Sequence, residues 1–232
     1  MNLAIKSKAI TNKQRGFTLI ELMISIVIGL IILAAVLGMF VSMIKSDSDN
    51  LKAIRLNHEL RAAMSLITRD IRRAGVDGLS ATRGTGPYPF STSTTRLTIG
   101  NNHQGNANAC VSFAYDEDKD GIDDVNTERY GYRWDSDDKT VESGENSIGA
   151  VCSASGWENI TDDKLIEIFP ETIASVTHPG LEFGETCVKE AGMFIRQIGV
   201  TIRGRLRKDP TVARTITETV KIRNEDDTGP CP

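Results

Sequence analysis

The sequence predicts an α+β fold in which one long N-terminal helix packs on an antiparallel β-sheet. Two patterns support this prediction. Residues 17–74 first form an uninterrupted apolar run and then place apolar residues at helical spacing. From residue 96 onward, short runs of strand-forming residues alternate with turn-forming residues. The 232 residues are enough for one membrane span and one globular head.

The apolar run extends from Phe17 to Ile44 and contains a single ionisable side chain, that of Glu21. A run of this length without other charges is typical of a membrane-spanning helix. A carboxylate so close to the start of such a helix is costly in hydrocarbon and normally requires a partner. Four basic residues and no acidic residue precede the run, which favours a cytoplasmic location for that end. These residues are Lys6, Lys8, Lys13 and Arg15.

Residues 45–74 continue the helix as an amphipathic segment. Its apolar residues recur every three or four positions, so one face of the helix can be buried. These residues are Leu56, Leu60, Met64, Ile67 and Ile71. Gly75 and Gly78 mark the end of the helix. Gly29 and Gly38 weaken the helix locally within the apolar run.

The rest of the chain predicts a head rich in β-strands. Residues 75–96 are rich in Gly, Pro, Ser and Thr, which indicates a long connecting loop. The candidate strands lie at residues 96–99, 110–115, 129–134, 139–142, 165–169, 181–183, 193–203 and 214–223. The last two alternate apolar and polar residues, and they predict an antiparallel hairpin with one buried face and a turn at Asp209-Pro210.

The four cysteines all follow the apolar run. An even number of cysteines beyond a span with a cytoplasmic N-terminus places them in the periplasm, where disulfides persist. Three pairings can be drawn, and we favour two bonds that keep sequential β segments together. These bonds are Cys110–Cys152 and Cys187–Cys231. A zinc site is the alternative, but the sequence has no Cys-x-x-Cys and no nearby histidine.

The segment 116–124 has the spacing of a calcium-binding loop. Oxygen-bearing residues occupy its first, third and fifth positions, glycine its sixth and an acid its ninth, as in the first part of an EF-hand. Thr127 stands where an EF-hand has its bidentate Glu, so the segment is more similar to thrombospondin-type Asp-x-Asp-x-Asp-Gly-x-x-Asp loops. We expect Ca²⁺ to bind the side chains of Asp116, Asp118, Asp120 and Asp124 and the carbonyl of Ile122. The alternative is a solvated acidic turn, since Asp and Gly are the commonest turn formers.

Charge and composition favour a structural role over catalysis or nucleic-acid binding. The net charge is −4, and loss of the basic residues before the apolar run would leave the rest more acidic. Such a charge argues against binding of DNA or RNA by a general basic face. The three histidines, His58, His103 and His178, lie in no Ser-His-Asp or Cys-His context. We therefore expect no enzymatic activity and no required cofactor, with Ca²⁺ as the one candidate ligand.

The stretch Arg15-Gly16-Phe17-Thr18-Leu19-Ile20-Glu21, with the apolar run behind it, resembles the class III signal of type IV prepilins. The resemblance implies that prepilin peptidase cuts after Gly16 and that Phe17 becomes an N-methylated N-terminus. It also implies that Glu21 faces the N-terminal amine of a neighbouring subunit. An ordinary secretory signal is the alternative, but its apolar region is shorter, carries no acid and is followed by a small-residue cleavage site.

This resemblance implies a pilin-like fold and divides the chain into four parts. Residues 1–16 would be a cleaved leader, and 17–44 a transmembrane helix that becomes the filament core. Residues 45–74 would continue this helix into the head, and 75–232 would form a β-rich periplasmic head. The protein is therefore expected in the inner membrane, as a single-pass precursor that is later incorporated in a pilus.

Three further segments resemble the PilW group of minor pilins: Arg-Asp-Ile-Arg-Arg-Ala-Gly at 69–75, Gly-Trp-Glu-Asn-Ile at 156–160 and Val-Lys-Ile-Arg-Asn at 220–224. This resemblance implies a minor pilin that primes or caps the type IV pilus together with other minor pilins, the major pilin and an inner-membrane assembly platform. Such pili serve twitching motility, adhesion and DNA uptake. The alternatives are a J-like pseudopilin of type II secretion, a membrane-tethered enzyme, and a pilus-tip adhesin or DNA-binding pilin.

Overall fold

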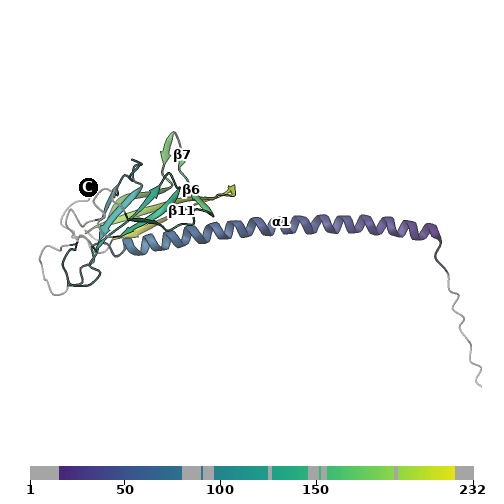
Figure 1. Ribbon diagram of the computed structural model, residues 1–232, viewed down its shortest axis with the longest axis horizontal. Helices are drawn as coiled ribbons and strands as arrows, with labels where there is room; N and C mark the ends of the chain where they lie inside the picture. The colour runs from purple at the N-terminus through teal and green to yellow at the C-terminus, as the bar shows by residue number, and fades with distance from the viewer. Residues whose placement is uncertain are drawn as a thin grey trace, which may run out of the picture. The chain divides into compact units, whose positions relative to one another are not determined.

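In the computed structural model, the described part of the chain forms one helix followed by antiparallel β-strands, which confirms the predicted α+β, pilin-like architecture. The described residues are 16–79, 90, 97–124, 127–145, 152, 156–190 and 193–222. The elements are α1 (Leu19–Ile71), β1 (Thr98–Gly100), β2 (Cys110–Ala114), β3 (Arg129–Asp135), β4 (Thr140–Glu145), β5 (Trp157–Asn159), β6 (Ile166–Ile168), β7 (Glu171–Ile173), β8 (Val176–His178), β9 (Leu181–Glu190), β10 (Met193–Leu206) and β11 (Asp209–Lys221). Figure 1 shows them coloured along the chain. The chain divides into two units, residues 1–50 and residues 51–232.

The first unit consists, from Leu19 onward, of the N-terminal part of α1. Every residue between 19 and 50 is exposed, although most side chains up to Ile44 are apolar. By length and composition α1 can cross a membrane, a test that a signal sequence near the N-terminus would also pass. The helix continues through Gly29 and Gly38, so these glycines do not break it.

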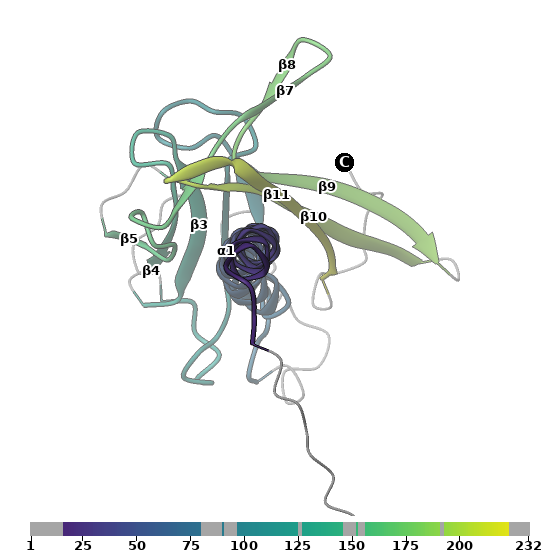
Figure 2. The ribbon, with the colours of Figure 1, turned by 90° about the vertical axis from the view of Figure 1, so that its right-hand side faces the viewer.

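In the second unit, the strands form two antiparallel sheets and a separate small hairpin. Sheet A has the order β1-β2-β3-β4-β5. In sheet B, β11 pairs with one side of β10, while β9 and β6 pair with its other side. Among the described strands, β7 and β8 pair with each other and with no other strand. Figure 2 shows β3, β4 and β5 in one layer and β9, β10 and β11 in another.

The core lies where residues 51–71 of α1 pack against the sheets. The predicted apolar face of this segment is buried and joins the side chains of both sheets in one cluster. Helix and sheet approach closely at β10, because a Cβ placed on Gly204 would lie 2.6 Å from a methyl carbon of Leu60. The Nζ of Lys52 lies 3.0 Å from a carboxylate oxygen of Asp209 and joins this part of the helix to the start of β11.

The end of α1 is fixed by backbone contacts with the end of β2 and the residues that follow it. Gly75 has a φ of 75°, which favours glycine, and its N–H donates to the carbonyl of Ala114 at 2.8 Å. The N–H of Asp116 donates to the carbonyl of Val76 at 2.9 Å. A Cβ placed on Gly78 would lie only 2.7 Å from that of Lys119, so the two segments touch. These contacts place the acidic loop beside the helix end.

The predicted hairpin of the last two strands is confirmed, but its predicted turn is wrong. Strands β10 and β11 pair antiparallel, and Ile198, Ile202 and Val220 on one face are buried. The turn lies at Arg207-Lys208, and Asp209-Pro210 begin β11 instead. Proline is tolerated there because, among the described strands, none pairs with the outer side of β11.

Three short strands were not predicted. Strand β5 lies at the edge of sheet A, and β7 and β8 form a hairpin that turns at Ala174-Ser175. Both turn residues have positive φ, 48° and 70°, without the Gly or Asn that normally signals such a turn. Most of the predicted loop at 75–96 lies outside the described residues, although Phe90 within it is fully buried.

Candidate functional site

The start of α1 is organised around Thr18 and Glu21. Residues 16–18 have no regular structure, and the helix begins at Leu19. The N–H of Glu21 donates to the Thr18 hydroxyl oxygen at 3.3 Å, which makes Thr18 the N-cap residue. A glutamate three residues after a threonine cap also suits the positive end of the helix dipole.

Gly16 and Phe17 lie in the non-helical segment before this cap. Phe17 is 82% exposed, and a Cβ placed on Gly16 would meet no atom within 4 Å. The described structure therefore gives no packing reason for glycine at position 16. The predicted roles of Gly16, Phe17 and Glu21 stay predictions.

The apolar surface of α1 between Leu19 and Ile44 is covered by no described part of the chain. All its large hydrophobic side chains are more than half exposed. An exposed apolar surface of this extent marks contact with lipid or with other proteins. Gly29 and Gly38 belong to this surface, since a Cβ on either would meet nothing within 4 Å. Small residues of this kind allow close packing of helices in membranes.

The acidic loop brings together three of the four predicted carboxylate ligands. One oxygen from each of Asp116, Asp118 and Asp120 lies within 4.8 Å of the others. Asp124 is not part of this group, and its N–H instead donates to Glu128 at 2.9 Å. The side chain of Ile122 is exposed. The loop lies between β2 and β3, so strands flank it, as the sequence predicted.

Asp116 organises the loop through its backbone partners. It is 5% exposed, and its carboxylate accepts hydrogen bonds from the N–H groups of Gly78 (2.8 Å), Lys119 (2.6 Å) and Gly121 (3.0 Å). Gly121 has a φ of 72°, which explains glycine at the sixth position of the loop. The carboxylate is therefore fixed in place by the protein itself.

Glu128 is a residue of this loop that the sequence analysis missed. It is 3% exposed, and its two oxygens accept hydrogen bonds from the N–H groups of Glu117 and Asp124, each at 2.9 Å. The pKa of this carboxyl is raised, because the effect of burial exceeds that of the two backbone hydrogen bonds, which lower the pKa. The side chain closes the loop across its base. Glu128 lies one position beyond the place of the bidentate Glu in an EF-hand, so comparison with that motif did not identify it as part of the site.

A groove lies between the end of α1 and sheet A, next to the acidic loop. Its volume is about 240 Å³. Leu66, Arg69 and Asp70 come from α1 and Arg73 from the turn after it, and the sheet side contributes Tyr115, Glu117, Tyr130, Gly131, Tyr132, Ser143, Gly144 and Glu145. Two tyrosine hydroxyls donate to carboxylates at 2.5 Å, one from Tyr132 to Asp70 and one from Tyr130 to Glu117. Burial, with these hydrogen bonds, raises the pKa of both tyrosines.

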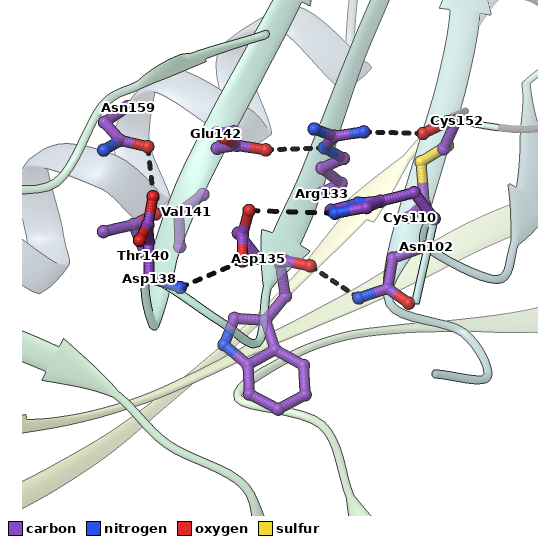
Figure 3. Close-up of polar contacts among 12 residues, drawn as sticks. Asn102, Cys110, Arg133, Asp135, Asp138, Thr140, Val141, Glu142, Cys152 and Asn159 are labelled. Carbon is purple, nitrogen blue, oxygen red and sulfur yellow. Dashed lines mark hydrogen bonds and ion pairs between the residues drawn. A yellow bond between two sulfur atoms is a disulfide. The ribbon is translucent and has the colours of Figure 1, made fainter. Parts of the chain in front are cut away.

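The other face of sheet A carries the disulfide and a network of buried polar groups, shown in Figure 3. Cys110 and Cys152 are bonded, with their Cα atoms 6.3 Å apart, which confirms this predicted pairing. Arg133 holds the same segment, since its guanidinium donates to Glu142 (2.5 Å) and to the carbonyl of Cys152 (2.9 Å). Cys187 is also disulfide-bonded. Its predicted partner, Cys231, lies outside the described residues, so that pairing stays a prediction.

The fold and the N-terminal segment together define a pilin-like protein: a capped apolar helix preceded by a glycine and a phenylalanine, followed by an antiparallel head. The family model of the prokaryotic N-terminal methylation motif matches residues 11–37. The model of prepilin peptidase-dependent protein B matches residues 49–222, and the chain belongs to that family. The match covers the second half of the helix and most of the head, and it does not single out the PilW group. No curated protein and no solved structure gave a match.

Proposed function

We propose that this chain is a minor pilin that primes or caps a type IV pilus together with other minor pilins. The observation that carries the proposal is the exposed apolar surface of α1, which contains one carboxylate, Glu21. The family match supports dependence on prepilin peptidase. In this account the peptidase cuts after Gly16, and Phe17 becomes the methylated N-terminus. The head is periplasmic, and the role is structural rather than enzymatic.

The proposed mechanism is a transfer of α1 from lipid to protein surroundings. In the inner membrane, the side chains between Leu19 and Ile44 contact lipid. In the filament, the same side chains contact helices of the major pilin and of other minor pilins, delivered by the assembly platform. Lipid and packed helices are similarly apolar, so the transfer has a small net cost, and small residues such as Gly29 and Gly38 permit close approach.

Glu21 would set the register of this packing. Cleavage creates an α-amine at Phe17, and a carboxylate in apolar surroundings attracts a neighbouring subunit's amine strongly. Removing both charges from water is costly, so the pair contributes alignment more than net stability. Either charge alone in the apolar core is disfavoured, and misaligned subunits would therefore be excluded.

The test is co-assembly of the Glu21→Gln variant, with Asp47→Asn as the control because Asp47 is an exposed acid of α1 beyond the apolar run. We expect Glu21→Gln to insert and to be cleaved normally but to be depleted from purified pili. We expect Asp47→Asn to be present at the wild-type level. Incorporation of Glu21→Gln at the wild-type level would overturn the pairing. If the protein instead co-purified with secretion components and not with pili, the J-like pseudopilin alternative would replace the minor pilin.

We also propose that the loop 116–124 binds Ca²⁺. The convergence of three carboxylates, one of them buried and fixed by backbone hydrogen bonds, supports this proposal. Asp116, Asp118 and Asp120 would supply side-chain oxygens, and Asp124 and the carbonyl of Ile122 would complete the ligands on binding. Extracellular sites of this kind bind Ca²⁺ with a Kd of about 10⁻⁴–10⁻³ M. The role of the ion would be to stiffen the loop beside the end of α1.

A further inference from the structure

The groove between α1 and sheet A contains a guanidinium group for which the described residues provide no acceptor. Arg73 lies two residues past the end of α1, with its guanidinium carbon 3.9 Å from the centre of the Tyr115 ring. Within the described part of the chain, no residue accepts a hydrogen bond from this guanidinium or forms an ion pair with it. Arg73 is exposed, so its five N–H donors can reach a ligand.

The stacking partner of Arg73 is itself held rigidly. The Tyr115 ring is buried and stacks on the Tyr130 ring, with centroids 4.2 Å apart and 7° between the planes. Tyr130 is fixed in turn by the hydrogen bond from its hydroxyl to Glu117. A guanidinium stacked on a fixed aromatic ring is oriented before a ligand arrives, which reduces the entropy lost on binding.

Of the other charges that line the groove, all but that of the exposed Glu145 are already engaged. Arg69 lies 3.3 Å from Asp70, which also accepts the hydrogen bond from Tyr132. Glu117 accepts the hydrogen bond from Tyr130. Among the described residues of the groove, Arg73 is thus the one cation free to recognise an anion. Three carboxylates and two guanidinium groups line the groove. The excess of negative charge disfavours a doubly charged phosphate more than a singly charged carboxylate.

We propose that this groove binds the carboxylate of an acidic side chain presented by a neighbouring protein subunit. Arg73 holds the carboxylate through paired N–H donors, the geometry that a planar guanidinium offers. The volume of about 240 Å³ fits one side chain rather than a folded segment. The source of the carboxylate rests on the proposed function, in which this chain packs among other subunits. The inference also gives a role to the segment 69–75, which supplies both arginines of the groove.

The inference can be tested by NMR on the full-length protein in detergent micelles, with the amide signal of Gly144 on the opposite wall as the reporter. The probe is glutamate blocked at both ends, and blocked glutamine is its neutral control. We expect glutamate to shift the Gly144 signal saturably and glutamine to leave it unchanged. In Arg73→Gln, with the remaining spectrum intact, we expect affinity to fall about tenfold or more. Arg72→Gln is the matched control, because Arg72 is an exposed neighbour that does not line the groove.

Several results would overturn the inference. These are an equal response to blocked glutamine, an unchanged affinity in Arg73→Gln, a tighter response to inorganic phosphate than to glutamate, or no saturable shift at all. A Tyr115→Leu variant adds a second measurement, since loss of the stacked ring should weaken glutamate binding while Arg73 remains. The test needs no pilus, so a negative result would not bear on the proposed role of Glu21. Conversely, normal assembly of Glu21→Gln would not bear on ligand binding in the groove.

Discussion

The two parts of α1 have different relations to the rest of the chain. Between residues 19 and 50 every side chain is exposed, whereas residues 51–71 bury one face against the head. The second part is amphipathic because its partner belongs to the same chain. Up to Ile44 the first part is apolar all round apart from Glu21, as expected for a helix whose neighbours are lipid and other subunits. Substitutions in the first part should therefore affect assembly, and those in the second part should affect stability.

The largest expected effect is on the stability of the head, and it should differ between two leucines of α1. Leu60 is fully buried, whereas Leu33 is 53% exposed. We expect Leu60→Ala to lower the free energy of unfolding of the head by about 2–5 kcal/mol, because it leaves a cavity in the core. Leu33→Ala should leave it unchanged. Urea unfolding of the full-length protein in detergent, followed by the fluorescence of the buried Trp134, measures both. Equal losses in the two variants would contradict the division of α1 into two parts.

Two glycines provide a second test of the difference between the two parts of α1: Gly38 lies in the first part, and Gly204 packs against the second. A Cβ at Gly204 would lie 2.6 Å from the side chain of Leu60, whereas a Cβ at Gly38 would meet nothing within 4 Å. We expect Gly204→Ala to destabilise the head by about 1–3 kcal/mol through overpacking. Gly38→Ala should not destabilise the head and should raise the helix propensity of the first part by about 1 kcal/mol. Thermal unfolding monitored by circular dichroism distinguishes the two, and a destabilised head in Gly38→Ala would count against the account.

A third prediction concerns the dependence of the stability of the head on acidic pH. Hydrogen bonds from Arg205 lower the pKa of Glu167 from 4.5 to about 2, with a further contribution from Lys139. The folded-state pKa is therefore depressed, and the stabilisation is present above pH 4.5 and is lost as the pH falls toward 2. Because Lys139 precedes β4 and Arg205 lies in β10, this carboxylate joins the two sheets.

The measurement is the urea midpoint between pH 6 and pH 2, recorded for the wild type and for Glu167→Gln. We expect the wild type to lose more stability than the variant between pH 4.5 and 2, because the variant has no carboxylate to protonate. Asp137→Asn, an exposed acid of the turn before β4, should keep the wild-type profile. Parallel profiles for the wild type and Glu167→Gln would remove Glu167 as a cause of acid sensitivity.

The smallest expected effect is that of Ca²⁺ on the head. At a Ca²⁺ concentration ten times its Kd, binding should add about 1.4 kcal/mol to the free energy of unfolding, seen as a rise in Tm. Asp118→Asn combined with Asp120→Asn should abolish the rise, and Asp137→Asn should keep it. The proposed Ca²⁺ site would be withdrawn if Ca²⁺ left the wild-type Tm unchanged, or if Mg²⁺ at the same concentration raised it equally.

The sequence predicted features that depend on local patterns. The long helix and its buried face follow from apolar spacing, and the pairing of β10 with β11 follows from alternation. The turn of that hairpin was misplaced because Asp209-Pro210 is a stronger local turn signal than Arg207-Lys208, and only the edge position of β11 lets Pro210 remain in a strand. Strands β7 and β8 were missed because each has three residues and their turn lacks glycine.

The candidate sites show the same limit. The three converging aspartates of the acidic loop are neighbours in sequence, and their spacing was readable. Glu128 was missed because only the folded loop turns it inward. The groove was also missed because Arg73 stacks on Tyr115, and both line the groove with Tyr130, although these residues are distant in sequence. No local sequence pattern predicts this contact, because it depends on how the end of α1 packs on sheet A.

The central claim is that the first part of α1 is released by cleavage so that it can pack among other subunits. The most direct test is mass spectrometry of the protein purified from cells, which gives its first residue and any modification of it. We predict that the mature chain begins at an N-methylated Phe17. A mature chain that keeps Gly16, or that begins beyond Phe17, would contradict the account.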